Sequence, residues 1–151
     1  MWCYYQFQVS ISGYSGVSLT WDQTSSNTGP RDFKLQYSTN GSTFTDFGNY
    51  TVQANGLSPN AAWNGTTPSA AYNLSFDLTS ITALGNQATA FFRLVDNSTV
   101  AVNSPNPVAS TGTNRVDNFT VNAAPVPIPP ALGLMAAGLG LLGGVARKRK
   151  S

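Results

Sequence analysis

Histidine and glutamate are both absent from this chain of 151 residues, and cysteine occurs once, at Cys3. Without histidine the chain can build neither a Ser-His-Asp triad, nor a Cys-His pair, nor a histidine-based metal site. A single thiol cannot form an internal disulfide bond. These absences exclude much of common hydrolytic and metal-dependent catalysis. We therefore expect no enzymatic activity, no catalytic residue, no metal ligand and no cofactor.

Charged residues are also scarce, at 9% of the chain. Four of the eight Lys and Arg residues lie among the last five positions, and all six acidic residues are Asp. Without that basic end, residues 1–146 carry four basic and six acidic side chains, a net charge of −2. The four remaining basic residues are scattered, whereas nucleic-acid binding needs a clustered basic patch. No nucleic-acid partner is expected.

The rest of the sequence consists largely of short segments in which apolar and polar residues alternate. Successive side chains of a strand point to opposite faces, so this period predicts strands with one buried and one exposed face. Asn40-Gly41 lies between two such segments and predicts a hairpin, and residues 80–84 could form one helical turn. The predicted strands are 4–11, 17–21, 33–37, 44–52, 74–78, 88–95 and 115–121.

About seven short strands with turn residues between them favour an all-β fold, an antiparallel β-sandwich of the jelly-roll or immunoglobulin-like kind. We expect this domain over residues 1–122, followed by a Pro-rich linker and motif at 123–130. Residues 131–146 are free of charge and predict a transmembrane helix, although 16 residues are fewer than the roughly 20 that span a bilayer comfortably. Residues 147–151 form a basic tail that the positive-inside rule places in the cytoplasm.

This C-terminal region resembles a PEP-CTERM sorting signal, a three-part order of proline motif, apolar run and basic end. The motif is Val126-Pro127-Ile128-Pro129-Pro130, and the basic stop-transfer cluster is Arg147-Lys148-Arg149-Lys150. The usual motif is Val-Pro-Glu-Pro; with Ile128 in the glutamate position, this chain is closer to the Val-Pro-Leu-Pro-type variant. The resemblance implies that an exosortase, a membrane-embedded cysteine transpeptidase, cleaves near the motif. An ordinary C-terminal membrane anchor is the alternative.

An exported protein of this kind is expected to begin with a signal peptide. Residues 1–5 have neither a basic start nor a long apolar core, and a strand pattern follows directly. We therefore expect the β-domain to be truncated at its N-terminus, with the signal peptide and further strands upstream.

The part of the chain before the C-terminal region, here called the body, has a second, weaker resemblance. The residues that carry it are Leu19-Thr20-Trp21-Asp22-Gln23, residues 28–41, Phe92-Arg93-Leu94 and residues 112–118. It resembles jelly-roll modules of bacterial exported proteins, which share their fold with carbohydrate-binding modules. That resemblance implies no catalytic role.

Two groups of side chains in the body could contact a ligand. Asp22, Asp32, Asp96 and Asp117 fall at predicted strand ends or in loops, where oxygen ligands could hold Ca²⁺ or, more simply, cap turns and pair with arginines. Trp21 falls on the apolar side of its strand and is expected in the core. Trp63 lies in a loop rich in Gly, Asn, Thr and Pro, where it could either anchor the loop or contact a ligand.

The sequence thus predicts an exported, non-enzymatic bacterial protein of the cell surface or extracellular matrix. It would be anchored transiently in the membrane through residues 131–146 and processed by an exosortase, in the setting of biofilm exopolysaccharide. A polysaccharide is a further candidate partner. The alternative function is a carbohydrate-binding module, which could be the C-terminal fragment of a larger extracellular enzyme.

Overall fold

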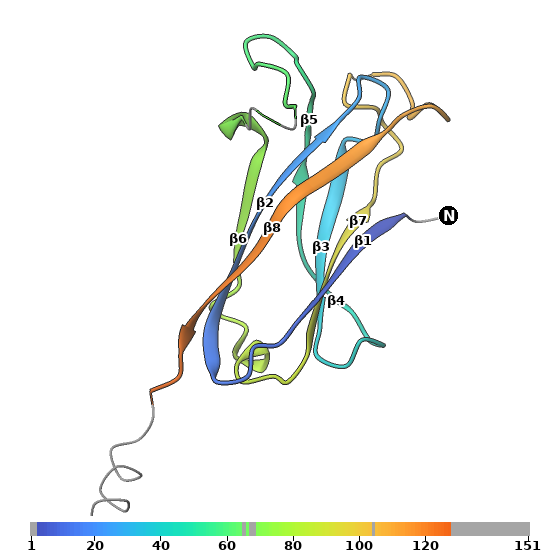
Figure 1. The fold of residues 1–151 in the computed structure, drawn as a ribbon. Coiled ribbons are helices and arrows are strands. Elements are labelled where there is room, and N and C mark those ends of the chain that lie inside the picture. Colours follow the sequence, from blue (N-terminus) through green and yellow to red (C-terminus); the bar gives the residue numbers. More distant parts are fainter. Residues whose placement is uncertain (1–2, 65, 67–68, 104, 128–151) are drawn as a thin grey trace, which may run out of the picture.

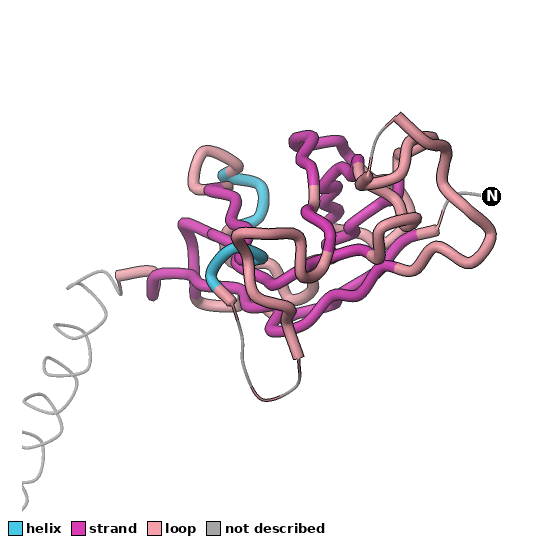
Figure 2. Tube along the Cα trace, turned by 90° about the horizontal axis from the view of Figure 1, so that it is seen from above, coloured by secondary structure: helices cyan, strands magenta, loops and turns pink. Residues whose placement is uncertain are grey.

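The computed structural model describes residues 3–64, 66, 69–103 and 105–127, and these form an all-β fold (Figure 1). The predicted all-β class is confirmed, because helix within these described residues is limited to two short 3-10 turns at the margin of the strands (Figure 2). These turns are η1 (Ala70–Tyr72) and η2 (Thr82–Leu84). The strands are β1 (Tyr4–Val9), β2 (Tyr14–Ser25), β3 (Asp32–Ser38), β4 (Thr45–Thr51), β5 (Gln53–Ala54), β6 (Asn73–Asp77), β7 (Ala90–Asp96) and β8 (Asn114–Pro125).

The first sheet has the strand order β1-β7-β3-β4, and all its pairs are antiparallel. Tyr5 and Leu35 both stand opposite Leu94, so the inward positions of three strands lie in one row. Leu35 and Leu94 are fully buried, while their chain neighbours point outward, as the period-two pattern requires. The β3–β4 hairpin confirms the turn predicted at Asn40-Gly41, where Gly41 has a φ of 73°.

The second sheet is built around the long strand β2. β8 pairs with one edge of β2, β6 pairs antiparallel with the other edge, and the short β5 pairs parallel near the end of β2. Figure 1 shows β2 and β8 running side by side along most of their length. Because β2 has a partner on each side, its inward side chains Val17, Leu19 and Trp21 are almost completely buried.

The core lies between the two sheets and is rich in aromatic rings. Trp21, predicted to be in the core, has no exposed surface and packs against Tyr50 of the first sheet and Phe76 of the second. The ring centroids are 5.3 and 5.9 Å apart, within the usual range for paired aromatic side chains. The contact of Trp21 with Tyr50 crosses between the sheets and helps to hold the two layers together.

One side of the sheet pair is less well covered than the rest. β1 and β8 are the edge strands there, and β8 has no strand along its outer edge among the described residues. The Phe7 and Phe119 rings stack across this side with their centroids 3.7 Å apart, and both are only half-buried. Val9, Val121 and Ala123 border a small hollow at one end of it. The apolar side chains between β1 and β8 are therefore only partly covered.

The predicted transmembrane helix at 131–146 and the basic tail at 147–151 lie outside the described residues. Among the residues that the structure does describe, no helix has the length and apolar character needed to cross a membrane.

Candidate functional site

The start of the predicted sorting motif follows directly on the last strand. β8 ends at Pro125, and the Val126 N–H donates to the Gly13 carbonyl at 2.8 Å. The Val126 side chain is 43% exposed. The motif residues Ile128, Pro129 and Pro130 and the cluster Arg147-Lys148-Arg149-Lys150 lie outside the described residues.

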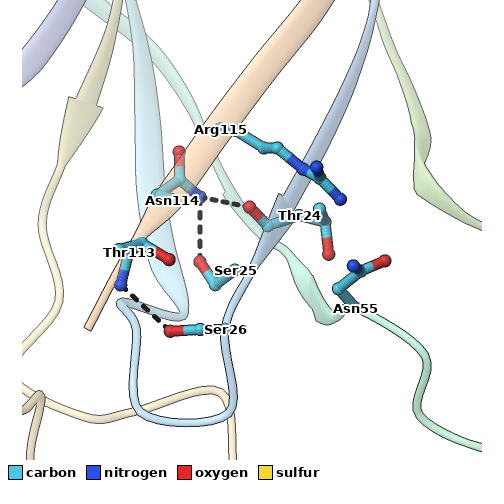
Figure 3. Close-up of a pocket in the computed structure, with 7 residues that line it drawn as sticks. All are labelled: Thr24, Ser25, Ser26, Asn55, Thr113, Asn114 and Arg115. Carbon is cyan, nitrogen blue, oxygen red and sulfur yellow. Dashed lines mark hydrogen bonds between the residues drawn. The ribbon is translucent and has the colours of Figure 1, made fainter. Parts of the chain in front are cut away.

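A polar cleft lies at the opposite end of β8, and we call it the Arg115 cleft. Its volume is about 340 Å³. Arg115 is its only charged lining residue, and its side chain extends over Thr24 (Figure 3). The lining residues come from β2, the segment after β5 and the start of β8: Thr24, Ser25, Ser26, Asn55, Thr113, Asn114 and Arg115.

Hydrogen bonds across this end of the sheet fix the polar side chains of the Arg115 cleft. Asn114 Nδ2 donates to the Thr24 carbonyl at 3.1 Å and to Ser25 Oγ at 2.8 Å (Figure 3). The Thr113 N–H donates to Ser26 Oγ at 3.0 Å. The Thr24 and Ser25 hydroxyls are almost fully buried and donate to backbone carbonyls, so the cleft combines a rigid polar wall with the exposed Arg115 side chain.

Trp63, the candidate ligand contact, packs beside this cleft and is only 7% exposed. The Arg115 guanidinium carbon lies 4.6 Å from the centre of the Trp63 ring, and Arg115 Nη2 donates to the Trp63 carbonyl at 2.6 Å. Tyr72 stacks on Trp63 at a centroid separation of 6.4 Å. The Trp63 N–H also donates to Asn55 Oδ1 at 2.7 Å. The residue therefore occupies the loop-anchoring position and presents little ring surface to a ligand.

The four aspartates considered as Ca²⁺ ligands fall into two pairs: Asp22 stands opposite Asp117 in the β2–β8 ladder, and Asp32 and Asp96 each accept from Ser98. Asp32 pairs with Arg31 at 2.9 Å, and the 8% exposed Asp22 accepts from Asn73 Nδ2 and Asn118 Nδ2. Asp96, the last residue of β7, accepts the Ser98 N–H, and Asp117, within β8, accepts the Asn118 N–H. Within the described ranges, no three acidic or thiol side chains converge where they could hold a metal ion.

A buried polar network lies behind the cleft, and the sequence analysis did not identify it. Gln23 is 1% exposed; its Oε1 accepts from Trp21 Nε1 and from the Tyr50 hydroxyl, each at 2.9 Å. Its Nε2 donates to Asn114 Oδ1 at 3.0 Å, which links the core to the cleft. Burial raises the pKa of Tyr50 far above its ordinary value, an effect that the hydrogen bond to Gln23 only partly offsets. The sequence did hold a signal for this burial, because Gln23 continues the alternating inward series of Val17, Leu19 and Trp21.

Comparisons of this chain with protein-family models, with curated proteins and with solved structures found no match.

Proposed function

We propose that this is an exported, non-enzymatic bacterial protein of the cell surface or extracellular matrix, sorted by its C-terminal signal. An exosortase would cleave near Val126–Pro130 after the apolar run 131–146 has docked in the membrane. The basic end at 147–151 would remain in the cytoplasm. The order of proline motif, apolar run and basic end is the observation that carries this proposal.

The place where the chain leaves the β-domain supports the sorting proposal. The motif begins on the exposed Val126, one residue after β8, so a membrane enzyme could reach it without unfolding a strand. The 12-residue strand β8 separates Val126 from the Arg115 cleft by roughly 40 Å at the usual rise per residue. Processing or attachment at the C-terminal end would therefore leave the cleft accessible.

The strand order supports a jelly roll as the finer description of the fold. With the short β5 set aside, the strands β1 to β8 have the order and pairing of the second to the eighth strands of an eight-stranded jelly roll. The first strand of such a fold would pair with the outer edge of β8, the edge left without a partner among the described residues. An immunoglobulin-like arrangement would not place β1 beside β7 in the same sheet as β3 and β4.

Mass spectrometry of the C-terminus, on protein recovered from the native host with and without the exosortase, tests the proposal. We expect residues 131–151 to be lost only where the exosortase is present. A Pro127→Ala, Pro129→Ala double variant should retain them, while Pro107→Ala, a proline in a loop outside the motif, should be processed normally. An intact C-terminus in both strains would contradict the sorting proposal and make the tail an ordinary anchor.

A carbohydrate-binding module is the second candidate function, and the Arg115 cleft is the observation that favours it. Fixed hydroxyl and amide groups around a guanidinium are the groups that bind sugar hydroxyls and carboxylates. A catalytic domain encoded upstream would favour this candidate, whereas a signal peptide a few dozen residues upstream would favour the first.

A further inference from the structure

A second group of polar and aromatic side chains lies on the outer face of the first sheet, away from the Arg115 cleft. Gln6, Arg93 and Gln36 form one row across β1, β7 and β3. Tyr4, Val95 and Lys34 form the next row across the same strands. The chain neighbours Leu35 and Leu94 point into the core, so these side chains lie on the outer face of the sheet, where Val95 is covered to 7% exposure. We call this surface the Arg93 face; it holds a shallow hollow of about 270 Å³.

Arg93 is held firmly at the centre of this face. Its guanidinium carbon lies 3.4 Å from the ring centre of Phe44 and 4.3 Å from that of Tyr4. Its Nε donates to Gln6 Oε1 at 2.8 Å. Contacts of this kind restrict the side chain before any ligand arrives, so little conformational entropy would be lost on binding.

The charge of Arg93 has no counterpart within the described part of the protein. Arg31 and Lys34 each pair with a carboxylate there, Asp32 and Asp46, but Arg93 pairs with none. Its two terminal amino groups donate to no described residue. An arginine fork that is oriented, charged and free at its outer end matches the geometry of a carboxylate.

The remaining groups of the Arg93 face suit a sugar polymer that carries such carboxylates. The Tyr4 side chain is 51% exposed and offers ring surface to sugar C–H groups. Lys34 and the Gln36 amide are both held on the Asp46 carboxylate, at 2.9 and 2.7 Å, so Arg93 carries the one charge of this face that no described carboxylate neutralises. One unpaired cation, in a chain whose residues 1–146 have a net charge of −2, is too little for a nucleic-acid footprint.

We infer that the Arg93 face binds an acidic polysaccharide, with a uronate carboxylate on the Arg93 fork and a neighbouring sugar ring on Tyr4. The choice of a polysaccharide rests on the proposed extracellular function. The binding chemistry itself rests on the geometry of Arg93.

Binding of polygalacturonate to the 151-residue chain in detergent micelles tests this inference by titration calorimetry. We expect binding that weakens with added salt, and no comparable binding of neutral dextran or of single-stranded DNA. Arg93→Gln should weaken binding roughly tenfold or more, because it removes a charge-assisted bidentate contact. Arg93→Lys keeps the charge without the fork and should bind between the wild type and Arg93→Gln. Tyr4→Ala should also weaken binding.

Two variants serve as matched controls. Tyr14→Ala removes a tyrosine that is 46% exposed on β2, and Arg31→Gln removes an arginine that Asp32 already neutralises. Both should bind as the wild type does, and near-ultraviolet circular dichroism should show that every variant is folded.

Three results would overturn the inference: no binding of polygalacturonate, equal binding of dextran or DNA, or unchanged binding by Arg93→Gln. None of them bears on C-terminal processing, and failure of processing would leave this binding in place. The two proposals can therefore fail separately.

Discussion

At the scale of single residues, the core depends on one buried amide. Gln23 Oε1 is the acceptor for both the Trp21 indole N–H and the Tyr50 hydroxyl, and no buried side-chain donor or acceptor in the described residues lacks a partner. Trp21 and Tyr50 come from different sheets, so Gln23 joins the two layers by hydrogen bonds in the middle of an otherwise aromatic cluster. Loss of a buried acceptor leaves its donors desolvated, which costs more than the hydrogen bonds contribute.

We therefore predict that Gln23→Leu lowers the free energy of unfolding by about 2–4 kcal/mol, since it leaves two buried donors without an acceptor. Urea denaturation followed by tryptophan fluorescence measures this change. Gln8→Leu, on the exposed side of β1, should change stability by less than about 0.5 kcal/mol. Equal stability of the two variants would show that the network does not stabilise the core.

At the scale of elements, the loops at the Arg115 cleft are fixed by a close approach of two backbones. A Cβ at Gly112 would lie 2.9 Å from the Gly29 Cα and closer still to the Thr28 carbonyl. The Ala109 N–H also donates to that carbonyl, at 3.0 Å. This packing of two loops positions Thr113 and Asn114, and so shapes the cleft.

Gly112→Ala is predicted to destabilise the protein by about 2–3 kcal/mol, because the methyl group meets backbone that cannot move without separating the two loops. Thermal unfolding should show the loss as a lower Tm. Thr111→Ala, at an exposed position of the same loop, should stay within about 0.5 kcal/mol of the wild type. A wild-type Tm for Gly112→Ala would mean that the loops separate freely.

At the scale of the whole molecule, charge is divided between the body and the C-terminal end. The sequence isoelectric point of about 8.9 comes from the last residues, because residues 1–146 have a net charge of −2. Processing near the proline motif would therefore change the sign of the protein's net charge.

We predict that surface-extracted protein focuses at an acidic pH, whereas protein from a host without the exosortase focuses near its basic full-length value. Isoelectric focusing of the two preparations measures the difference. The cause is the loss of Arg147, Lys148, Arg149 and Lys150 together. A basic species in the surface fraction of the normal host would count against processing, independently of the mass measurement.

The sequence by itself determined the all-β class, most of the strands and the core position of Trp21, because alternation and turn chemistry are local properties. It did not indicate β5, which is only two residues long and forms through its pairing with the end of β2.

Only the tertiary structure decided which side chains meet. Arg115, 52 residues along the chain, lies over the Trp63 ring, a contact that the sequence did not indicate. Gln23 with Asn114 and Arg93 with Tyr4 are further contacts that the sequence did not indicate. Residues distant in the chain become neighbours only through the pairing of strands within the two sheets. Local pattern specifies which face of a strand is buried, and sheet topology specifies what that face contacts.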